Sequence, residues 1–164
     1  MVPFRKVNLP HVPGKLFLHH LPGMRGEPVD EFLLAMRRIG VSQIVCLPPG
    51  DEIAALAPDY STAIREGTVP AQVHMLSIDD GCAPADEEEY LAVVHQVAKA
   101  LRAGRAIVVH CRGGIGRTGT FAVDVLVALG EDLDTALEAV ADAGSQPETE
   151  TQMQWLARRR PSPD

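Results

Sequence analysis

The most constraining feature of the sequence is the segment 106–129, in which an apolar run leads through a glycine-rich loop into a second apolar run. Residues 106–109 read AIVV, the loop at 110–119 reads HCRGGIGRTG, and residues 121–129 are apolar at almost every position. This order indicates a buried strand, a tight loop and a buried helix. Such a loop can present backbone N–H groups to an oxyanion at the start of the helix.

The residue types within the loop fit the binding of a phosphate group. Gly113, Gly114 and Gly116 keep side chains out of the inside of the loop and permit positive φ angles. Arg117 can hold two phosphate oxygens with its planar guanidinium, which a lysine could not do. The residues expected to bind phosphate are therefore consecutive: Arg112, Gly113, Gly114, Ile115, Gly116 and Arg117.

A thiol at the start of the loop adds a nucleophile to this phosphate site. Cys111 would lie beneath the phosphorus, where the loop N–H groups, the helix dipole and Arg117 all favour its thiolate. An anionic thiolate can attack phosphorus in line and form a phosphocysteine. Thr118 is placed for its hydroxyl to reach the sulfur and ease its departure in the second step. The alternative is a structural strand-to-helix turn with a buried cysteine.

The order His-Cys, five residues, Arg and then Ser or Thr resembles the signature loop of the cysteine-dependent protein phosphatases. The resemblance points to the small dual-specificity phosphatases and covers roughly residues 15–157. It implies catalysis without a metal or cofactor, and a supporting role for His110, which hydrogen-bonds backbone groups and shapes the loop. Since adjacent residues of a strand point to opposite faces, His110 is poorly placed to act as a base on Cys111.

Cleavage of a phosphoester also needs a proton for the leaving oxygen, which a carboxylic acid can supply before it activates water. Residues 78–84 read IDDGCAP and follow a strand-like run at 73–76, which indicates a loop. They resemble the Ile-Pro-Asp-Gly-Gly-x-Pro loop of the kinase-associated phosphatase group. Aligned on its glycine and proline, Asp80 takes the general-acid position and Asp79 is the second candidate. Both could instead be ordinary turn carboxylates.

The segment 144–152 reads GSQPETETQ and precedes an apolar helix face. It resembles the family segment whose glutamines help to place the hydrolytic water. Gln152 matches the second glutamine, whereas Glu148 stands where tyrosine-specific members carry the first. Direct participation of these two residues is one interpretation. The other is that acidic and hydroxyl residues simply begin a helix here.

Apolar periodicity elsewhere alternates between strands and helices. Strands are expected at 16–19, 43–47, 73–76 and 106–109, and helices at 27–39, 86–103, 121–129 and 132–143, with short helices between 51 and 70 and after 152. This order predicts an α/β fold with a central, mostly parallel sheet of about four to five strands and helices on both faces. The glycine-rich loop would then lie at the carboxyl end of a strand, where ligands bind in such sheets.

Length and charge limit the class of protein. With 164 residues, 46% of them hydrophobic, we expect a single phosphatase domain over 1–164, with an extended arm at 1–15 and a short tail at 158–164. The net charge of −7 disfavours nucleic acids and anionic membranes as partners. We expect a cytoplasmic location, because no secretion signal or membrane-spanning run is visible.

The three cysteines fit a reducing compartment, because they cannot all pair with one another. Cys46 is expected in the core. Cys82, two residues after Asp80, could form a disulfide with Cys111 that protects the thiol from over-oxidation, or it could be a small loop residue.

The histidines give no sign of a metal site. His74 and His95 are scattered, and no Cys-His spacing in the chain matches one. His19 and His20 could line the rim of the pocket close to Arg25, or they could be ordinary core or surface residues.

We therefore expect a phosphomonoester hydrolase that acts on phosphotyrosine, phosphoserine or phosphothreonine in a protein or peptide and binds oxyanions such as phosphate or vanadate. Phosphoinositide phosphatases of this superfamily tend to carry lysines at the positions of Arg112 and Ile115, so an apolar Ile115 favours a phosphoprotein. The alternatives are the same chemistry on inositol phosphates or RNA 5′-phosphates, a non-catalytic phosphate-binding module, and a sulfur-transfer enzyme.

Overall fold

The computed structural model describes residues 2–159 of the chain. Within them, five strands form one sheet: β1 (Arg5–Lys6), β2 (Lys15–His19), β3 (Val41–Cys46), β4 (Gln72–Met75) and β5 (Ala106–His110). The helices are α1 (Val29–Ile39), α2 (Gly50–Leu56), α3 (Pro58–Glu66), α4 (Glu87–Arg102), α5 (Gly116–Ala128), α6 (Leu133–Asp142) and α7 (Glu150–Ala157). None of the described helices is both long and apolar enough to cross a membrane.

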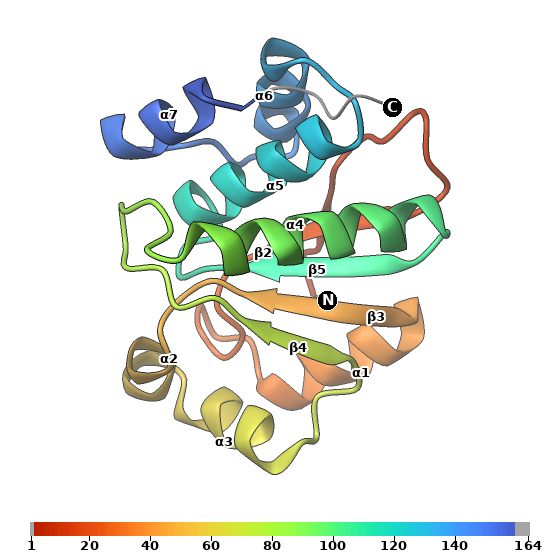
Figure 1. Ribbon diagram of the computed structural model, residues 1–164. Coiled ribbons are helices and arrows are strands. Elements are labelled where there is room, and N and C mark those ends of the chain that lie inside the picture. The colour runs from red at the N-terminus through yellow and green to blue at the C-terminus, as the bar shows by residue number, and fades with distance from the viewer. Residues whose placement is uncertain (1, 160–164) are drawn as a thin grey trace.

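The sheet is mostly parallel, as the alternation of strands and helices predicts. Its strand order is β1-β2-β5-β3-β4, and only the pairing of β1 with β2 is antiparallel (Figure 1). The segment 1–15, expected as an extended arm, therefore also contributes an edge strand, in which Arg5 pairs with Leu18. Of the expected tail at 158–164, residues 160–164 lie outside the described part of the chain.

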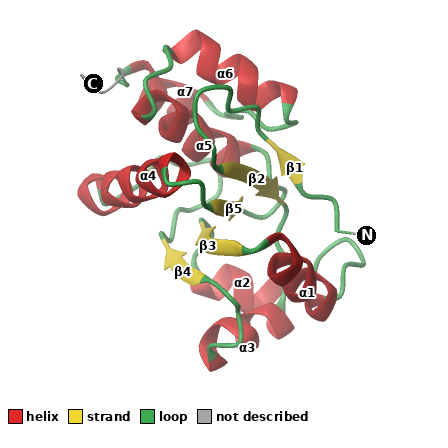
Figure 2. Ribbon diagram, turned by 90° about the vertical axis from the view of Figure 1, so that its right-hand side faces the viewer, coloured by secondary structure: helices red, strands yellow, loops and turns green. Residues whose placement is uncertain are grey.

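Helices cover both faces of the sheet, as Figure 2 shows from the side. Successive residues of β5 point to opposite faces. Ile107 and Val109 belong to the core cluster shared with α4–α7, whereas Ala106 and Val108 belong to the cluster shared with α1–α3. All five residues of β5 are buried, because this strand lies in the middle of the sheet between two helical layers.

The helix after the glycine-rich loop begins earlier than expected. Apolar periodicity places its start at Phe121, but α5 begins at Gly116, so Arg117 and Thr118 lie in its first turn. Every residue of this helix is buried, because α4, α6 and α7 pack around it. The side chain of Arg117 therefore lies at the amino end of the helix, next to the loop that would hold the phosphate.

Candidate active site

The loop that joins β5 to α5 places a buried thiol at the carboxyl end of the central strand. Cys111 follows directly after β5 and is only 3% exposed. The next residue, Arg112, is exposed. Among the residues expected to bind phosphate, the loop thus turns one charged side chain to the surface and keeps Arg117 inside, at 2% exposure.

The carbonyl groups of residues 111–116 all accept hydrogen bonds. That of Arg112 accepts from the N–H of Leu21 at 3.0 Å, and that of Gly114 accepts from Arg5 Nη2 at 2.6 Å. His110 Nδ1 donates to the carbonyl of Cys111, and Arg25 donates to that of Gly113. The carbonyl of Ile115 accepts from the N–H groups of Gly119 and Gln146, and that of Gly116 accepts from Thr120 Oγ1.

By contrast, the N–H groups of residues 112–116 have no hydrogen-bond acceptor among the described residues. Backbone N–H groups are strong donors that need a partner. A loop whose carbonyls are hydrogen-bonded and whose N–H groups stay free is therefore a cradle for an anion.

The three loop glycines differ in how strictly their positions require glycine. Among the three, only Gly114 uses the freedom that glycine permits and has a positive φ, at 75°. A Cβ on Gly114 would also collide with the carbonyl of His19. A Cβ on Gly116 would meet the carboxylate of Glu148, the end of a flexible side chain that can move aside. The structure thus brings Glu148 against the start of α5.

A carboxylate that sequence reasoning missed orients the expected phosphate-binding arginine. Arg117 donates from Nη1 and Nη2 to the two carboxylate oxygens of Glu52, at 3.2 and 2.8 Å, and from Nη1 to the carbonyl of Ile78 at 2.8 Å. Burial alone would lower the pKa of Arg117, but the hydrogen bonds and charge of Glu52, with the charges of Cys111 and Asp80, raise it above its ordinary value. Arg117 is therefore a fixed cation.

Of the two acid candidates, Asp80 is the one paired with this arginine. Its Oδ1 lies 3.6 Å from Arg117 Nη2, while its side chain remains 67% exposed toward solvent. Among the described residues, Asp79 forms no ion pair, and its carbonyl accepts from the N–H of Cys82 in the turn. The geometry thus favours Asp80 for contact with a substrate held by Arg117.

The loop that carries Asp80 is fastened to the start of α7. Thr149 Oγ1 donates to the carbonyl of Gly81 at 2.7 Å. The same hydroxyl accepts from the N–H of Gln152, and Gln152 Oε1 accepts from the N–H groups of Glu148 and Thr149. The oxygen of Gln152 is thus used to cap the helix, which is the helix-start interpretation of this segment.

His110 forms part of a buried hydrogen-bonded chain. The Tyr60 hydroxyl lies 3.2 Å from Cys46 Sγ and 2.9 Å from His110 Nε2, and His110 Nδ1 lies 3.1 Å from the carbonyl of Cys111. If Nδ1 donates to this carbonyl, Nε2 accepts from Tyr60. Burial lowers the pKa of His110 to about 3, which keeps the ring neutral. The ring thus contacts the backbone of the loop.

The remaining candidates lie around this centre. Thr118 Oγ1 is buried with no hydrogen-bond partner among the described residues, the Cys111 thiol included. Cys82 is exposed and Cys111 buried, and both are free thiols. Arg5, which sequence reasoning also missed, binds Gly114, Ala143 and Ser145, and burial lowers its pKa against the opposing effect of Cys111.

The expected rim histidines are not on the surface. His19 is 1% and His20 6% exposed, and the Nε2 of His19 lies 3.0 Å from both carboxylate oxygens of Glu27. Burial, and next the neighbouring His19, lower the pKa of His20. Arg25, by contrast, is exposed, with Nη2 at 3.5 Å from the carbonyl of Gly113.

A parallel sheet whose central strand ends in a thiol-bearing anion cradle, closed by an arginine in the next helix, defines the fold class of the protein-tyrosine phosphatases. The comparison of family models agrees. Residues 16–163 match PTP-SAK, described as Swiss Army Knife protein, DSP-PTPase phosphatase domain, so the chain belongs to this family of cysteine-dependent phosphatases. This confirms the resemblance inferred from the sequence. No curated protein matches the chain.

Solved structures share the fold at low sequence identity. Kinase-associated phosphatase, with serine in place of its catalytic-site cysteine, has a TM-score of 0.81 at 19% identity over 94% of this chain and 92% of that one. Tk-PTP in its active form gives 0.69 at 24% identity, covering 92% and 96%. P. aeruginosa TpbA in complex with pTyr gives 0.59 at 22% identity, covering 94% and 90%.

Proposed function

We propose that this phosphatase hydrolyses phosphomonoesters of proteins through a phosphocysteine on Cys111. The observation that supports the proposal most is the pairing of a free N–H cradle at residues 112–116 with a buried Arg117 fixed by Glu52. Preorganised donors of this kind stabilise charge that develops in a transition state. A cradle that only bound phosphate would need neither a thiol at its base nor an exposed aspartate beside the arginine.

In the first step, the thiolate of Cys111 attacks phosphorus while the bond to the leaving oxygen breaks. Asp80 donates its proton to that oxygen, and the loop N–H groups and Arg117 hold the other three oxygens. In the second step, Asp80 takes a proton from water, the water oxygen attacks phosphorus, and the P–S bond breaks. Inorganic phosphate and the thiolate of Cys111 are the products, so the enzyme returns to its starting state.

We assign supporting roles to four residues around this chemistry. Thr118 donates its unpartnered hydroxyl to the sulfur as it leaves. His110 holds the carbonyl of Cys111 and so sets the direction of the loop. Glu148, which lies against the start of α5, receives the attacking water in this proposal, and Gln152 Oε1 positions Glu148 by accepting its N–H at 2.7 Å.

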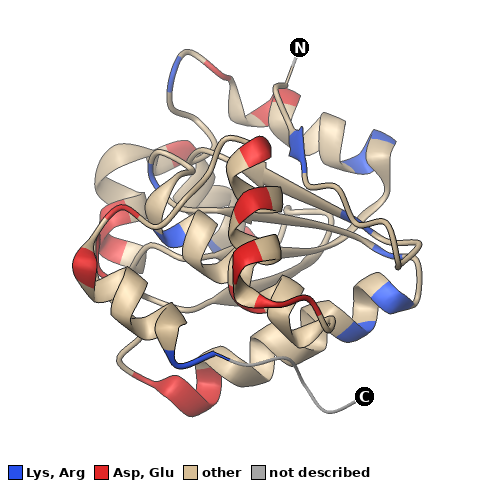
Figure 3. Cartoon of the chain, turned by 90° about the horizontal axis from the view of Figure 1, so that it is seen from above, with Lys and Arg blue, Asp and Glu red and all other residues tan. Residues whose placement is uncertain are grey.

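The charge of the chain favours a phosphoprotein over a polyanion. Asp and Glu number 22 against 15 Lys and Arg, and Figure 3 shows acidic positions on several helices of one side. Beside the pocket, position 115 is an isoleucine, so the loop offers only Arg112 as an extra surface cation. Inositol polyphosphates and RNA would be repelled by this field. Phosphotyrosine, phosphoserine and phosphothreonine proteins are thus the proposed substrates.

The test compares phosphate release from phosphotyrosine, phosphoserine and phosphothreonine peptides, an inositol polyphosphate and an RNA 5′-phosphate at equal concentration. We expect the highest kcat/KM on at least one of the peptides, and no turnover by Cys111→Ser. Higher kcat/KM on the inositol or RNA substrate would replace the proposed substrate class. Phosphate binding without turnover of any of them would indicate a binding module, and thiosulfate turnover would indicate sulfur transfer.

A further inference from the structure

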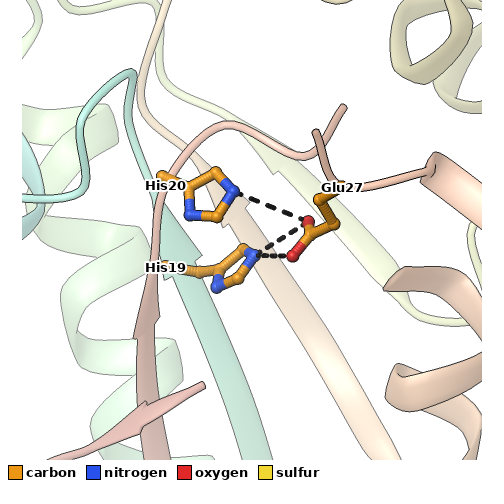
Figure 4. A group of neighbouring side chains, drawn as sticks. All are labelled: His19, His20 and Glu27. Atoms are coloured by element: carbon orange, nitrogen blue, oxygen red, sulfur yellow. Dashed lines mark hydrogen bonds and ion pairs between the residues drawn. The ribbon is translucent and has the colours of Figure 1, made fainter. Parts of the chain in front are cut away.

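Two imidazoles and a carboxylate meet beside the signature loop, at a place that the proposed reaction does not use. His19 ends β2, His20 follows it, and Glu27 comes from the loop that precedes α1. Figure 4 shows both rings turned toward the carboxylate. The Nε2 of His19 lies 3.0 Å from both oxygens of Glu27, and the Nε2 of His20 lies 3.8 Å from Oε1.

The cluster is buried, and two of its ring nitrogens, His19 Nδ1 and His20 Nε2, have no hydrogen-bond partner among the described residues. The side chains of His19, His20 and Glu27 are 0%, 7% and 8% exposed. The Nε2 of His20 is fully covered and makes no hydrogen bond among the described residues, although it faces a carboxylate oxygen. A buried polar atom left without a partner is costly. Its separation from Glu27 is too long for a hydrogen bond.

We propose that His19 Nε2, His20 Nε2 and the Glu27 carboxylate form a binding site for a divalent transition-metal ion, with zinc as the best fit. Their ligand atoms all lie within 4.8 Å of one another. Tetrahedral zinc with ligands at about 2.0–2.2 Å keeps them about 3.3–3.6 Å apart. The two nitrogen-to-carboxylate separations, 3.0 and 3.8 Å, lie on either side of this range, and the two imidazole nitrogens lie within 4.8 Å of each other, so the three side chains must draw together when the ion binds.

The donor set also selects the kind of ion. Two imidazole nitrogens and one carboxylate suit zinc and its transition-metal neighbours, whereas Mg²⁺ and Ca²⁺ prefer oxygen ligands. The proton that His19 Nε2 shares with Glu27 leaves that nitrogen when the ion takes its place. A water molecule would supply the fourth ligand.

An ion here would stabilise the rim of the phosphate loop rather than take part in the reaction. It would join the end of β2 to the far end of the loop 20–28, whose backbone has positive φ at Gly23, Arg25 and Gly26. The same loop binds the signature loop through Leu21 N–H on Arg112 and through Arg25 on Gly113. Fixing Glu27 to the two histidines would therefore hold Arg25 at the mouth of the cradle.

The sequence alone does not predict this metal site, for a geometric reason. Neighbouring residues of a strand point to opposite faces, so two adjacent histidines are not expected to share a ligand. Here the strand ends at His19, and His20 belongs to the chain that leaves the sheet. Glu27 then returns to both rings from seven residues further on, within a loop that carries no metal motif.

The test measures zinc binding to the full chain carrying Cys82→Ser and Cys111→Ser, because free thiols would themselves bind zinc. Calorimetry with a competing chelator should give one zinc per chain, no comparable binding of Mg²⁺, and a higher Tm with zinc. His20→Phe keeps an aromatic ring against His19, where the two ring centroids are now 4.1 Å apart, and leaves the His19–Glu27 contact intact. It should weaken zinc binding by about tenfold or more.

The matched control is His95→Phe, since His95 is exposed on α4 and far outside the cluster in sequence. This variant should bind zinc as its parent does. Equal zinc affinity of His20→Phe and its parent, or no zinc bound by the parent, would overturn the proposal. Anomalous scattering from zinc-soaked crystals of the parent gives a second readout, and an ion found away from the three side chains would also overturn it. Because this protein lacks Cys111, the result is independent of phosphatase activity.

Discussion

The carboxylate of Glu52 binds the guanidinium of Arg117, although Glu52 lies in a helix on the opposite side of the sheet. Both carboxylate oxygens accept hydrogen bonds, at 3.2 and 2.8 Å, although the residues are 65 positions apart. Glu52 lies on α2 and Arg117 in the first turn of α5. The arginine expected to bind phosphate is therefore held in place before any substrate arrives, which lowers the entropy lost on binding.

Glu52→Ala should reduce kcat/KM on p-nitrophenyl phosphate on the order of 10- to 100-fold, because the Arg117 guanidinium loses its orientation. The steady-state rate and the Kd for vanadate together measure this loss. Glu66→Ala, an exposed carboxylate on α3, is the control and should leave both unchanged. Unaltered kinetics in Glu52→Ala would show that Arg117 does not depend on this contact.

Asp80→Asn should lower kcat by roughly 10²–10⁴-fold, as expected for loss of a general acid. The neighbouring Asp79→Asn should stay within a few-fold of the wild type, because only Asp80 pairs with Arg117 among the described residues. Substrates with a poor leaving group should show the larger loss, since their oxygen needs the proton most. The opposite order of the two variants would move the role to Asp79.

His110 should make stability depend on pH in a defined direction. Burial depresses its folded pKa to about 3, below the unfolded value of about 6.5. The stability that neutral His110 contributes to the folded state is therefore fully present above the unfolded pKa and is lost as the pH falls toward 3. Between about pH 7.5 and about pH 5 this amounts to about 2 kcal/mol of unfolding free energy.

Urea unfolding of the wild type and of His110→Asn at these two pH values isolates that contribution, because all other titrating groups are shared. Over the same pH interval, the unfolding free energy of the variant should fall by about 2 kcal/mol less than that of the wild type. Parallel pH profiles for the two proteins would contradict the buried neutral state of His110.

The buried carboxylate of Asp124 links three helices. Asp124 Oδ2 accepts from the Tyr90 hydroxyl at 2.6 Å and from Trp155 Nε1 at 2.8 Å, linking α5 to α4 and α7. Asp124→Ala leaves both donors buried without a partner, so we expect about 2–4 kcal/mol less unfolding free energy. Asp134→Ala, an exposed change on α6, should cost much less. Equal losses would rule out the network as the cause.

Local patterns predicted the fold, and they located the loop on which the proposed site depends. The alternation of apolar strands and helices determines the parallel sheet, and the glycine-rich segment after β5 determines the loop with Cys111 and Arg117. The start of α5 was predicted five residues late, because the glycines and polar residues of its first turn show no apolar period. The edge strand β1 is too short, at two residues, to show any pattern.

Contacts between distant segments could not be predicted from one sequence. Nothing in residues 48–70 singles out Glu52 as the partner of Arg117, and nothing in the first 15 residues marks Arg5 as the donor to the Gly114 carbonyl. These pairs depend on how the loops at the carboxyl end of the sheet converge. The contact of Glu148 with the start of α5 at Gly116 likewise comes from a later segment of the chain.

The most direct test of the account is hydrolysis of p-nitrophenyl phosphate by freshly reduced protein with a chelator present, for the wild type and for Cys111→Ser. We predict turnover in the wild type that survives the chelator and is abolished in the variant, which should still bind vanadate or phosphate. Turnover that persists in Cys111→Ser, or that disappears when metals are removed, would contradict nucleophilic catalysis by Cys111.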